Sequence, residues 1–133
     1  MEIKAKKSVN LQKLVERVPV ALAIIPVLRL LAQRQETTTY KELGEIFGLH
    51  QKAIPGYLRV VDIYCTQHNL PRLNYLVVNQ ETQVAGGKMV PDAPMTFTEQ
   101  LKNQEKIFGF KWKQTKFPSE TTIYSDVIKT VAH

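Results

Sequence analysis

A tight turn between two amphipathic segments constrains this chain more than any other feature of its sequence. Thr39 and Glu42 stand three residues apart, the spacing at which a hydroxyl and a carboxylate each satisfy a free backbone N–H at a helix start. Gly48 predicts the end of that helix, because glycine readily takes the left-handed conformation of helix C-termini. Pro55 lacks an N–H and is tolerated in a first turn, so a second helix is expected to begin near Gln51.

Each of these two helices carries an apolar side that the fold must bury. The first helix has apolar residues at helical spacing, namely Tyr40, Leu43, Ile46 and Phe47. The buried side of the second helix is expected to comprise Leu58, Val61, Ile63, Tyr64 and Cys65. Leu49 is expected to fill the angle between the helices, and residues 69–71 are expected to end the second one.

Strand-forming residues follow the second helix. Residues 73–78 are dominated by Leu, Val and Tyr, and residues 79–82 supply a polar turn. Residues 83–85 are then expected to return as a second strand. Two helices joined by a turn and followed by a strand pair are typical of a winged helix-turn-helix. We therefore predict a mainly α protein with a small β wing, in which residues 38–87 form a winged helix-turn-helix core.

This core resembles the C-terminal DNA-binding domain of O6-alkylguanine-DNA alkyltransferases and their non-catalytic alkyltransferase-like relatives. The family pattern is roughly T-Y-x-E-L-A, then R-A-V-G, then P-C-H-R-V-V, and residues 39–44, 52–56 and 73–78 stand at the corresponding places. In that family the tyrosine helps to rotate a nucleotide out of the duplex, and the arginine fills the vacated space. The resemblance would give these roles to Tyr40 and Lys52.

The reactive residues of that family are replaced in this chain. Asn74 stands at the place of the nucleophilic cysteine, and Tyr75 stands at that of the neighbouring histidine. Lys52 in place of arginine loses the planar fork that stacks and forms hydrogen bonds in two directions. The resemblance therefore implies DNA contact and excludes alkyl transfer.

The start of the second helix of a helix-turn-helix enters the major groove, and backbone contacts position the protein there. The residues expected near base edges are His50, Gln51, Lys52 and Tyr57, with Tyr40 added by the resemblance. The residues expected to anchor phosphates are Arg59, Arg72, Lys88 and the terminal lysines.

The charge of the chain favours an anionic partner but is unevenly placed. The net charge is +6, with seven Lys/Arg against two acids in residues 1–35 and six against three in residues 101–133. Residues 36–100 hold five Lys/Arg and seven acids. Nucleic acid is the first candidate partner, and simple solubility is the alternative reading of the excess. The terminal segments are expected to supply much of the phosphate contact.

The N-terminal segment predicts two helices within residues 10–35. Pro19 is expected to restart the chain, and the run 20–32 is apolar almost all round, so it should form the central core helix. Pro26 inside this run predicts a kink or a break. The lysine-bearing residues 1–9 are expected to form a mobile basic arm or a frayed terminus.

The C-terminal extension, residues 95–133, is not part of a minimal winged helix. Thr96 and Glu99 repeat the capping pattern and open a helix to about residue 108. Residues 109–113 alternate in polarity and predict a strand, and a last helix is expected from 120 to 131. The extension is expected to pack on the core, to form a homodimer interface or to bind a partner.

No catalytic or metal-binding pattern stands out in the 133 residues, which are expected to form a single domain. Cys65 and His68 have a spacing that metal sites use, but no further ligand lies near them, and Cys65 fits the buried side of its helix. We predict no enzyme activity, cofactor or metal. The Pro- and Arg-containing apolar run argues against a membrane span, and a lone cysteine fits the cytoplasm.

The sequence therefore predicts a non-catalytic double-stranded DNA-binding protein. It would act as a regulator or as the DNA-reading subunit of a mobile element or a defence-related system. A protein-interaction module, an inhibitor or adaptor, is the alternative; its partner would bind at Phe108, Phe110 and Trp112, although Trp112 also fits a core anchor. A damaged-base sensor similar to the alkyltransferase-like proteins is a further alternative.

Overall fold

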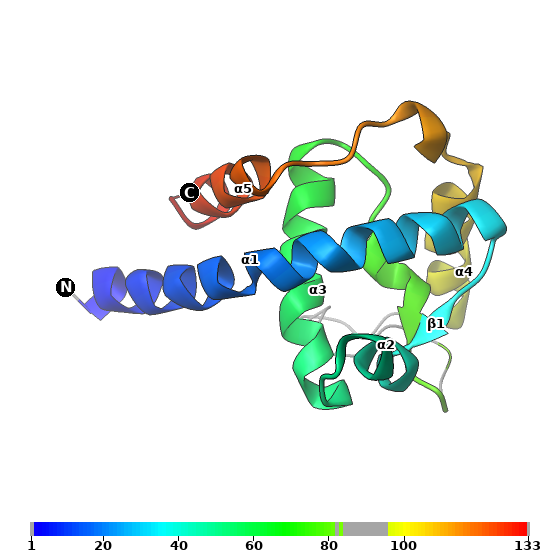
Figure 1. Cartoon of the computed structure of the whole chain (residues 1–133), viewed down its shortest axis with the longest axis horizontal. Helices are drawn as coiled ribbons and strands as arrows, with labels where there is room; N and C mark the ends of the chain where they lie inside the picture. The colour runs from blue at the N-terminus through cyan, green and yellow to red at the C-terminus, as the bar shows by residue number, and fades with distance from the viewer. Residues whose placement is uncertain (1, 82, 84–95, 133) are drawn as a thin grey trace.

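The molecule is built around one long helix (Figure 1). The computed structural model describes residues 2–81, 83 and 96–132, and the side chains of its first helix from residue 11 onward. Helix α1 spans Glu2–Arg34, and its second half is the expected central core helix. It packs against three later helices, α3 (Ile54–Gln67), α4 (Phe97–Gly109) and α5 (Glu120–Ala132). Its fully buried apolar side chains are Val18, Ala21, Ile24, Ile25, Leu28 and Ala32.

The two helices predicted within residues 10–35 are one continuous helix, so the predicted break was wrong. Pro19 and Pro26 both lie inside α1, and both are exposed. A proline inside a helix removes one hydrogen bond and crowds the preceding turn. Here that disturbance faces solvent, while the apolar side chains on the opposite side hold the helix against its neighbours. The backbone of residues 2–9 continues α1 and is not a separate arm.

Helix α2 (Tyr40–Phe47) begins and ends as predicted, with one change in its cap. The Thr39 hydroxyl accepts a hydrogen bond from the Glu42 N–H at 3.1 Å. The Glu42 carboxylate, however, accepts from the Thr38 hydroxyl at 3.0 Å. Gly48 ends the helix in the left-handed region, with a φ of 66°. The cap therefore also ties the helix to the residue that precedes it.

A short 3₁₀ helix, η1 (Gln51–Ala53), leads into helix α3 (Ile54–Gln67). All five residues predicted for the buried side of α3 are buried. The apolar face predicted for α2 is only partly right, because Ile46 is 61% exposed. Gly44 is buried where α2 contacts the turn. A Cβ atom at this position would stand 2.5 Å from the Leu49 carbonyl oxygen, so only glycine allows the close contact.

The strand predicted over residues 73–78 is mostly a 3₁₀ helix. Helix η2 (Leu73–Leu76) is buried throughout, and only β2 (Val77–Val78) is a strand. A short apolar run that is buried on all sides is compatible with a strand or with a helical turn, so composition alone could not separate the two. Strand β2 pairs in parallel with β1 (Thr38–Thr39). Most of the predicted return strand, residues 84 and 85, lies outside the described residues.

The C-terminal extension packs on the core. Helix α4 (Phe97–Gly109) starts at the predicted cap, where the Thr96 hydroxyl accepts from the Glu99 N–H at 3.1 Å. Its buried Gln100 side chain donates to the Tyr75 carbonyl oxygen of η2 at 2.6 Å. The strand predicted over residues 109–113 was wrong: the 3₁₀ turn η4 (Trp112–Gln114) replaces it, because the buried Trp112 ring must turn inward.

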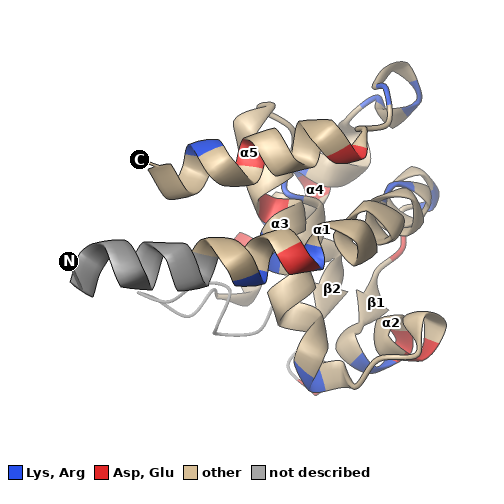
Figure 2. Ribbon diagram, turned by 60° about the vertical axis from the view of Figure 1, so that its left-hand side comes forward, with Lys and Arg blue, Asp and Glu red and all other residues tan. Residues whose placement is uncertain are grey.

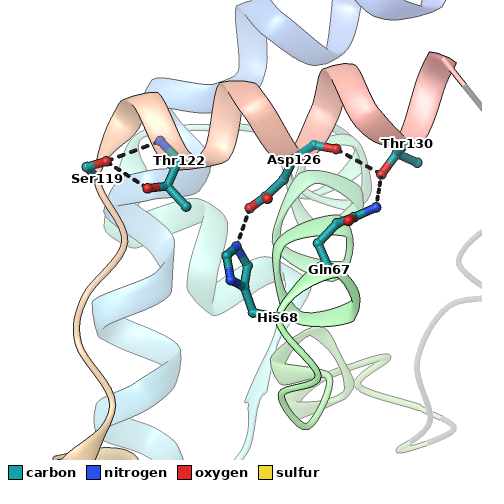
Figure 3. Close-up of polar contacts among 6 residues, drawn as sticks. All are labelled: Gln67, His68, Ser119, Thr122, Asp126 and Thr130. Carbon is teal, nitrogen blue, oxygen red and sulfur yellow. Dashed lines mark hydrogen bonds and ion pairs between the residues drawn. The ribbon is translucent and has the colours of Figure 1, made fainter.

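Helix α5 (Glu120–Ala132) is the predicted last helix, and polar contacts fix it to the end of α3 (Figure 3). The buried Asp126 carboxylate lies 2.8 Å from Nε2 of His68. One turn further on, the Gln67 amide donates to the Thr130 hydroxyl at 3.1 Å. The chain is therefore mainly helical, as the sequence predicted, but its small two-stranded sheet joins β1 to β2 in parallel and is not the predicted pair of residues 73–78 with 83–85.

Replacing Gly44 by alanine should destabilise the protein by about 1–3 kcal/mol, since the added methyl group meets a backbone oxygen that cannot rotate away. The measurement is urea unfolding followed by circular dichroism. Gly109→Ala is the matched control, because no atom lies within 4 Å of a Cβ placed there. An equal effect of both substitutions, or a stabilising Gly44→Ala, would contradict the close packing of α2 on the turn.

Candidate nucleic-acid interface

The turn between α2 and α3 exposes three of the residues predicted to contact DNA. His50, Gln51 and Lys52 are all exposed at η1, at the start of α3. The Nδ1 atom of His50 accepts a hydrogen bond from the Lys52 N–H at 3.1 Å and so caps the turn. This cap orients the imidazole and leaves Gln51 and Lys52 as the side chains that extend from the helix start.

A polar hollow of about 250 Å³ brings Tyr40 and Gln51 together. It is also lined by Thr39, Lys41, Asn79, Gln80 and Glu81. The hollow lies where β1 and β2 end and α2 begins. Its walls offer hydroxyls, amides, one ammonium and one carboxylate, groups that form hydrogen bonds with sugars, phosphates or base edges. Residues 79–81, directly after β2, form a local turn in which Asn79 Oδ1 accepts from the Glu81 N–H at 2.8 Å.

Basic side chains approach the start of α3 from two elements. Arg59 is exposed on α3 itself. Arg17 of α1 lies against Gly56, where a Cβ atom would stand 2.8 Å from the guanidinium carbon. Arg17 could not be predicted from the sequence, because its position depends on how α1 crosses α3. Tyr57, in contrast, is half-buried and packs on the core, so only part of it is accessible.

Arg72 and Lys88 differ from the other predicted phosphate contacts. The Arg72 guanidinium forms a two-point ion pair with Asp62, with Nε–Oδ1 and Nη2–Oδ2 distances of 2.5 and 2.7 Å. It also lies 4.8 Å from the centre of the Tyr75 ring. The hydrogen bonds to Asp62 raise the pKa of Arg72 and commit two donor atoms to the fold. Lys88 lies outside the described residues.

The positions aligned with the reactive residues of the alkyltransferases are buried. Asn74 is 1% exposed, and within the described part of the chain neither its amide nitrogen nor its amide oxygen has a hydrogen-bond partner. Tyr75 is buried beside it, and burial raises the pKa of its phenol. An amide and a neutral phenol supply no nucleophile at this place.

Cys65 is also unsuited to chemistry. It is fully buried, and burial raises the pKa of its thiol to about 12. His68, its predicted neighbour on the helix, pairs with Asp126 instead. Among the residues that the structure describes, no group of three or more His, Cys, Asp or Glu could hold a metal ion.

The aromatic residues predicted for a protein partner are unequally accessible. Trp112 is 1% exposed, and its indole N–H donates to the Ile107 carbonyl oxygen at 2.8 Å, so it is a core anchor and cannot contact a partner. Phe108 and Phe110 are half-buried. Phe110 lines a shallow, mainly apolar hollow of about 550 Å³, together with Asn69, Leu70, Pro71, Glu105, Lys106 and Gly109.

Comparisons with protein-family models, with curated proteins and with solved structures found no match to this chain. Within residues 2–81, 83 and 96–132, no helix combines the length and the apolar character needed to cross a bilayer.

Native Cys65 should resist thiol reagents. At pH 8 a thiol with a pKa of about 12 is almost entirely protonated, and the thiolate is the reactive form. We expect its reaction with Ellman's reagent to be at least about 100-fold slower in the folded protein than in urea at the same pH. Equal rates in the two conditions would show that Cys65 is accessible and would reopen a role in chemistry.

Proposed function

We propose that this chain is a non-catalytic double-stranded DNA-binding protein in which residues 38–87 act as a winged helix-turn-helix. The observation that carries the proposal is the exposed start of α3, where Gln51 and Lys52 extend from a capped turn beside a polar hollow. A helix N-terminus with exposed hydrogen-bonding side chains is the part of such a domain that contacts base edges.

The contacts divide into base-reading and backbone-anchoring ones. The Gln51 amide carries both donors and acceptors and can form paired hydrogen bonds with a base edge. Lys52 and Arg59 are exposed cations at the start of α3 and along it, and Lys41 lines the hollow beside them. Arg17 adds positive charge beside the first turn of α3. Tyr40, which lines the hollow, would face the sugar-phosphate backbone of the DNA.

The burial of the residues at the reactive places of the resembling family supports a binding role over alkyl transfer. The places of the reactive residues in the resembling family hold the buried Asn74 and Tyr75, and Cys65 is buried elsewhere. A small DNA-binding protein of this kind would serve in the cytoplasm as a regulator. It could equally be the DNA-reading subunit of a system that processes nucleic acid, such as a mobile element or a defence system.

Two other functions each have one observation in their favour. The apolar hollow at Phe110 favours a protein-interaction module, because exposed apolar concavities are typical of partner sites. The polar hollow at Tyr40 and Gln51 favours a damaged-base sensor. Stronger binding to a duplex with alkylated guanine than to a plain duplex would separate the sensor from an ordinary DNA-binding protein.

Reversing the charge of Lys52 should weaken duplex binding. In fluorescence anisotropy at about 100 mM salt, Lys52→Glu is expected to raise the dissociation constant by about tenfold and to lower the slope of log K against log salt by about 1. Lys129→Glu is the matched control, because Lys129 is an exposed lysine on α5 and its reversal changes the net charge equally.

The control should change binding by less than about twofold, because Lys129 lies on another helix and long-range charge effects are screened at this salt. Equal losses in both variants would mean that only net charge matters. No binding of wild type to any duplex at the lowest salt would overturn the proposed function.

A further inference from the structure

A second basic surface lies on the segment between α4 and α5, residues 110–117, which we call the basic strap. It carries three exposed lysines, Lys111, Lys113 and Lys116, and no acidic residue lies between Glu105 and Glu120. None of these lysines takes part in an ion pair among the described residues. Phe117, at the end of the strap, is 62% exposed.

The strap is held in one conformation by a buried anchor. Trp112 is buried, and its indole N–H is bonded to the Ile107 carbonyl oxygen. The Thr115 N–H donates to the Trp112 carbonyl oxygen at 3.0 Å and closes the turn. The lysines on either side of Trp112 therefore point away from a fixed backbone. A fixed backbone reduces the entropy that binding would cost.

Arg29 of α1 provides the second anchor. Its Nη2 atom donates to the carbonyl oxygens of Trp112 and, at 2.6 Å, Thr115. Its guanidinium carbon lies 4.0 Å from the centre of the Phe117 ring, a favourable cation–π contact. Arg29 is nevertheless buried, has no acidic partner in the part of the chain that the structure describes, and has its pKa lowered by burial. Its contacts with Trp112, Thr115 and Phe117 tie the strap to α1.

The strap and the start of α3 lie at opposite ends of the molecule (Figures 1 and 2). On α1, Arg17 contacts the first turn of α3 and Arg29 contacts the strap. Twelve residues of helix separate these two anchors, a rise of about 18 Å. This rise exceeds the Debye length of about 8 Å at physiological salt, so charges near one anchor are largely screened from charges near the other. Because the strap and the start of α3 lie at opposite ends of the molecule, a duplex at one of them does not have to cover the other.

We propose that the basic strap is a second surface for the phosphate backbone of duplex DNA, so that one molecule holds two DNA segments together. The inference rests on the proposed function, which supplies the duplex. The ammonium group of a lysine is a compact charge that can pair with phosphates in many orientations, and such contacts do not distinguish between bases. The strap would thus bind without sequence preference, whereas the start of α3 reads sequence.

The test is a bridging assay with the full chain. Protein is loaded on a bead-bound duplex, and a fluorescent second duplex is added at low salt. Wild type should recruit the second duplex. The triple variant Lys111→Gln, Lys113→Gln, Lys116→Gln should still bind one duplex and should recruit at least about tenfold less of the second, because its three phosphate contacts are lost.

The matched control removes the same charge outside the strap, by Lys102→Gln, Lys106→Gln and Lys129→Gln on α4 and α5. It should bridge like wild type. Arg29→Met, checked for folding by circular dichroism, should also reduce bridging although every lysine remains. Such a loss would show that the fixed backbone contributes.

The outcomes separate the two proposals. If wild type binds the first duplex and recruits no second one, the strap proposal is overturned and the proposed function stands. If the strap variant bridges as well as wild type, the two duplexes are held by a dimer through its α3 helices, and the strap proposal is again wrong. If wild type binds no duplex, both the proposed function and this inference are wrong.

Discussion

The burial of α1 is the constraint on which the rest of the structure depends. Helices α3 and α5 both pack on it, and η2 and α4 add further contacts (Figure 1). A helix with this many apolar side chains cannot be left alone in solvent, so α3 and the C-terminal extension both pack against it. The same packing keeps α1 continuous through Pro19 and Pro26. The prolines remove backbone hydrogen bonds on the exposed side of the helix, and this costs less than exposing the apolar side chains on its buried side.

The sequence predicted features that depend on a few neighbouring residues. The caps at Thr39 and Thr96, the left-handed Gly48 and the buried side of α3 are all local signals. The pairing of β1 with β2 could not be predicted in this way, since it joins residues almost 40 positions apart. Residues 73–76 were mistaken for a strand because apolar composition reports burial and not backbone geometry.

The same difference between local features and contacts of distant residues applies to the candidate site. Gln51 and Lys52 could be placed at a helix start from turn chemistry alone, and the structure exposes both. The pairing of Arg72 with Asp62, and the contacts of Arg17 and Arg29 with distant elements, depend on how the helices cross. For this reason a count of lysines and arginines along the chain did not reveal which cations are available to a ligand.

The two basic ends also explain how a weakly charged reading helix could serve a DNA-binding protein. Near the start of α3, Lys52 and Arg59 are the exposed cations of the η1–α3 segment, and Arg72 is committed to Asp62. Few phosphate contacts give modest non-specific affinity, because each contact adds about one counterion released. A second surface on the same rigid molecule makes capture of a nearby segment effectively intramolecular. In the proposed function, affinity would then come from holding two DNA segments, and Gln51 and Lys52 would discriminate between sequences.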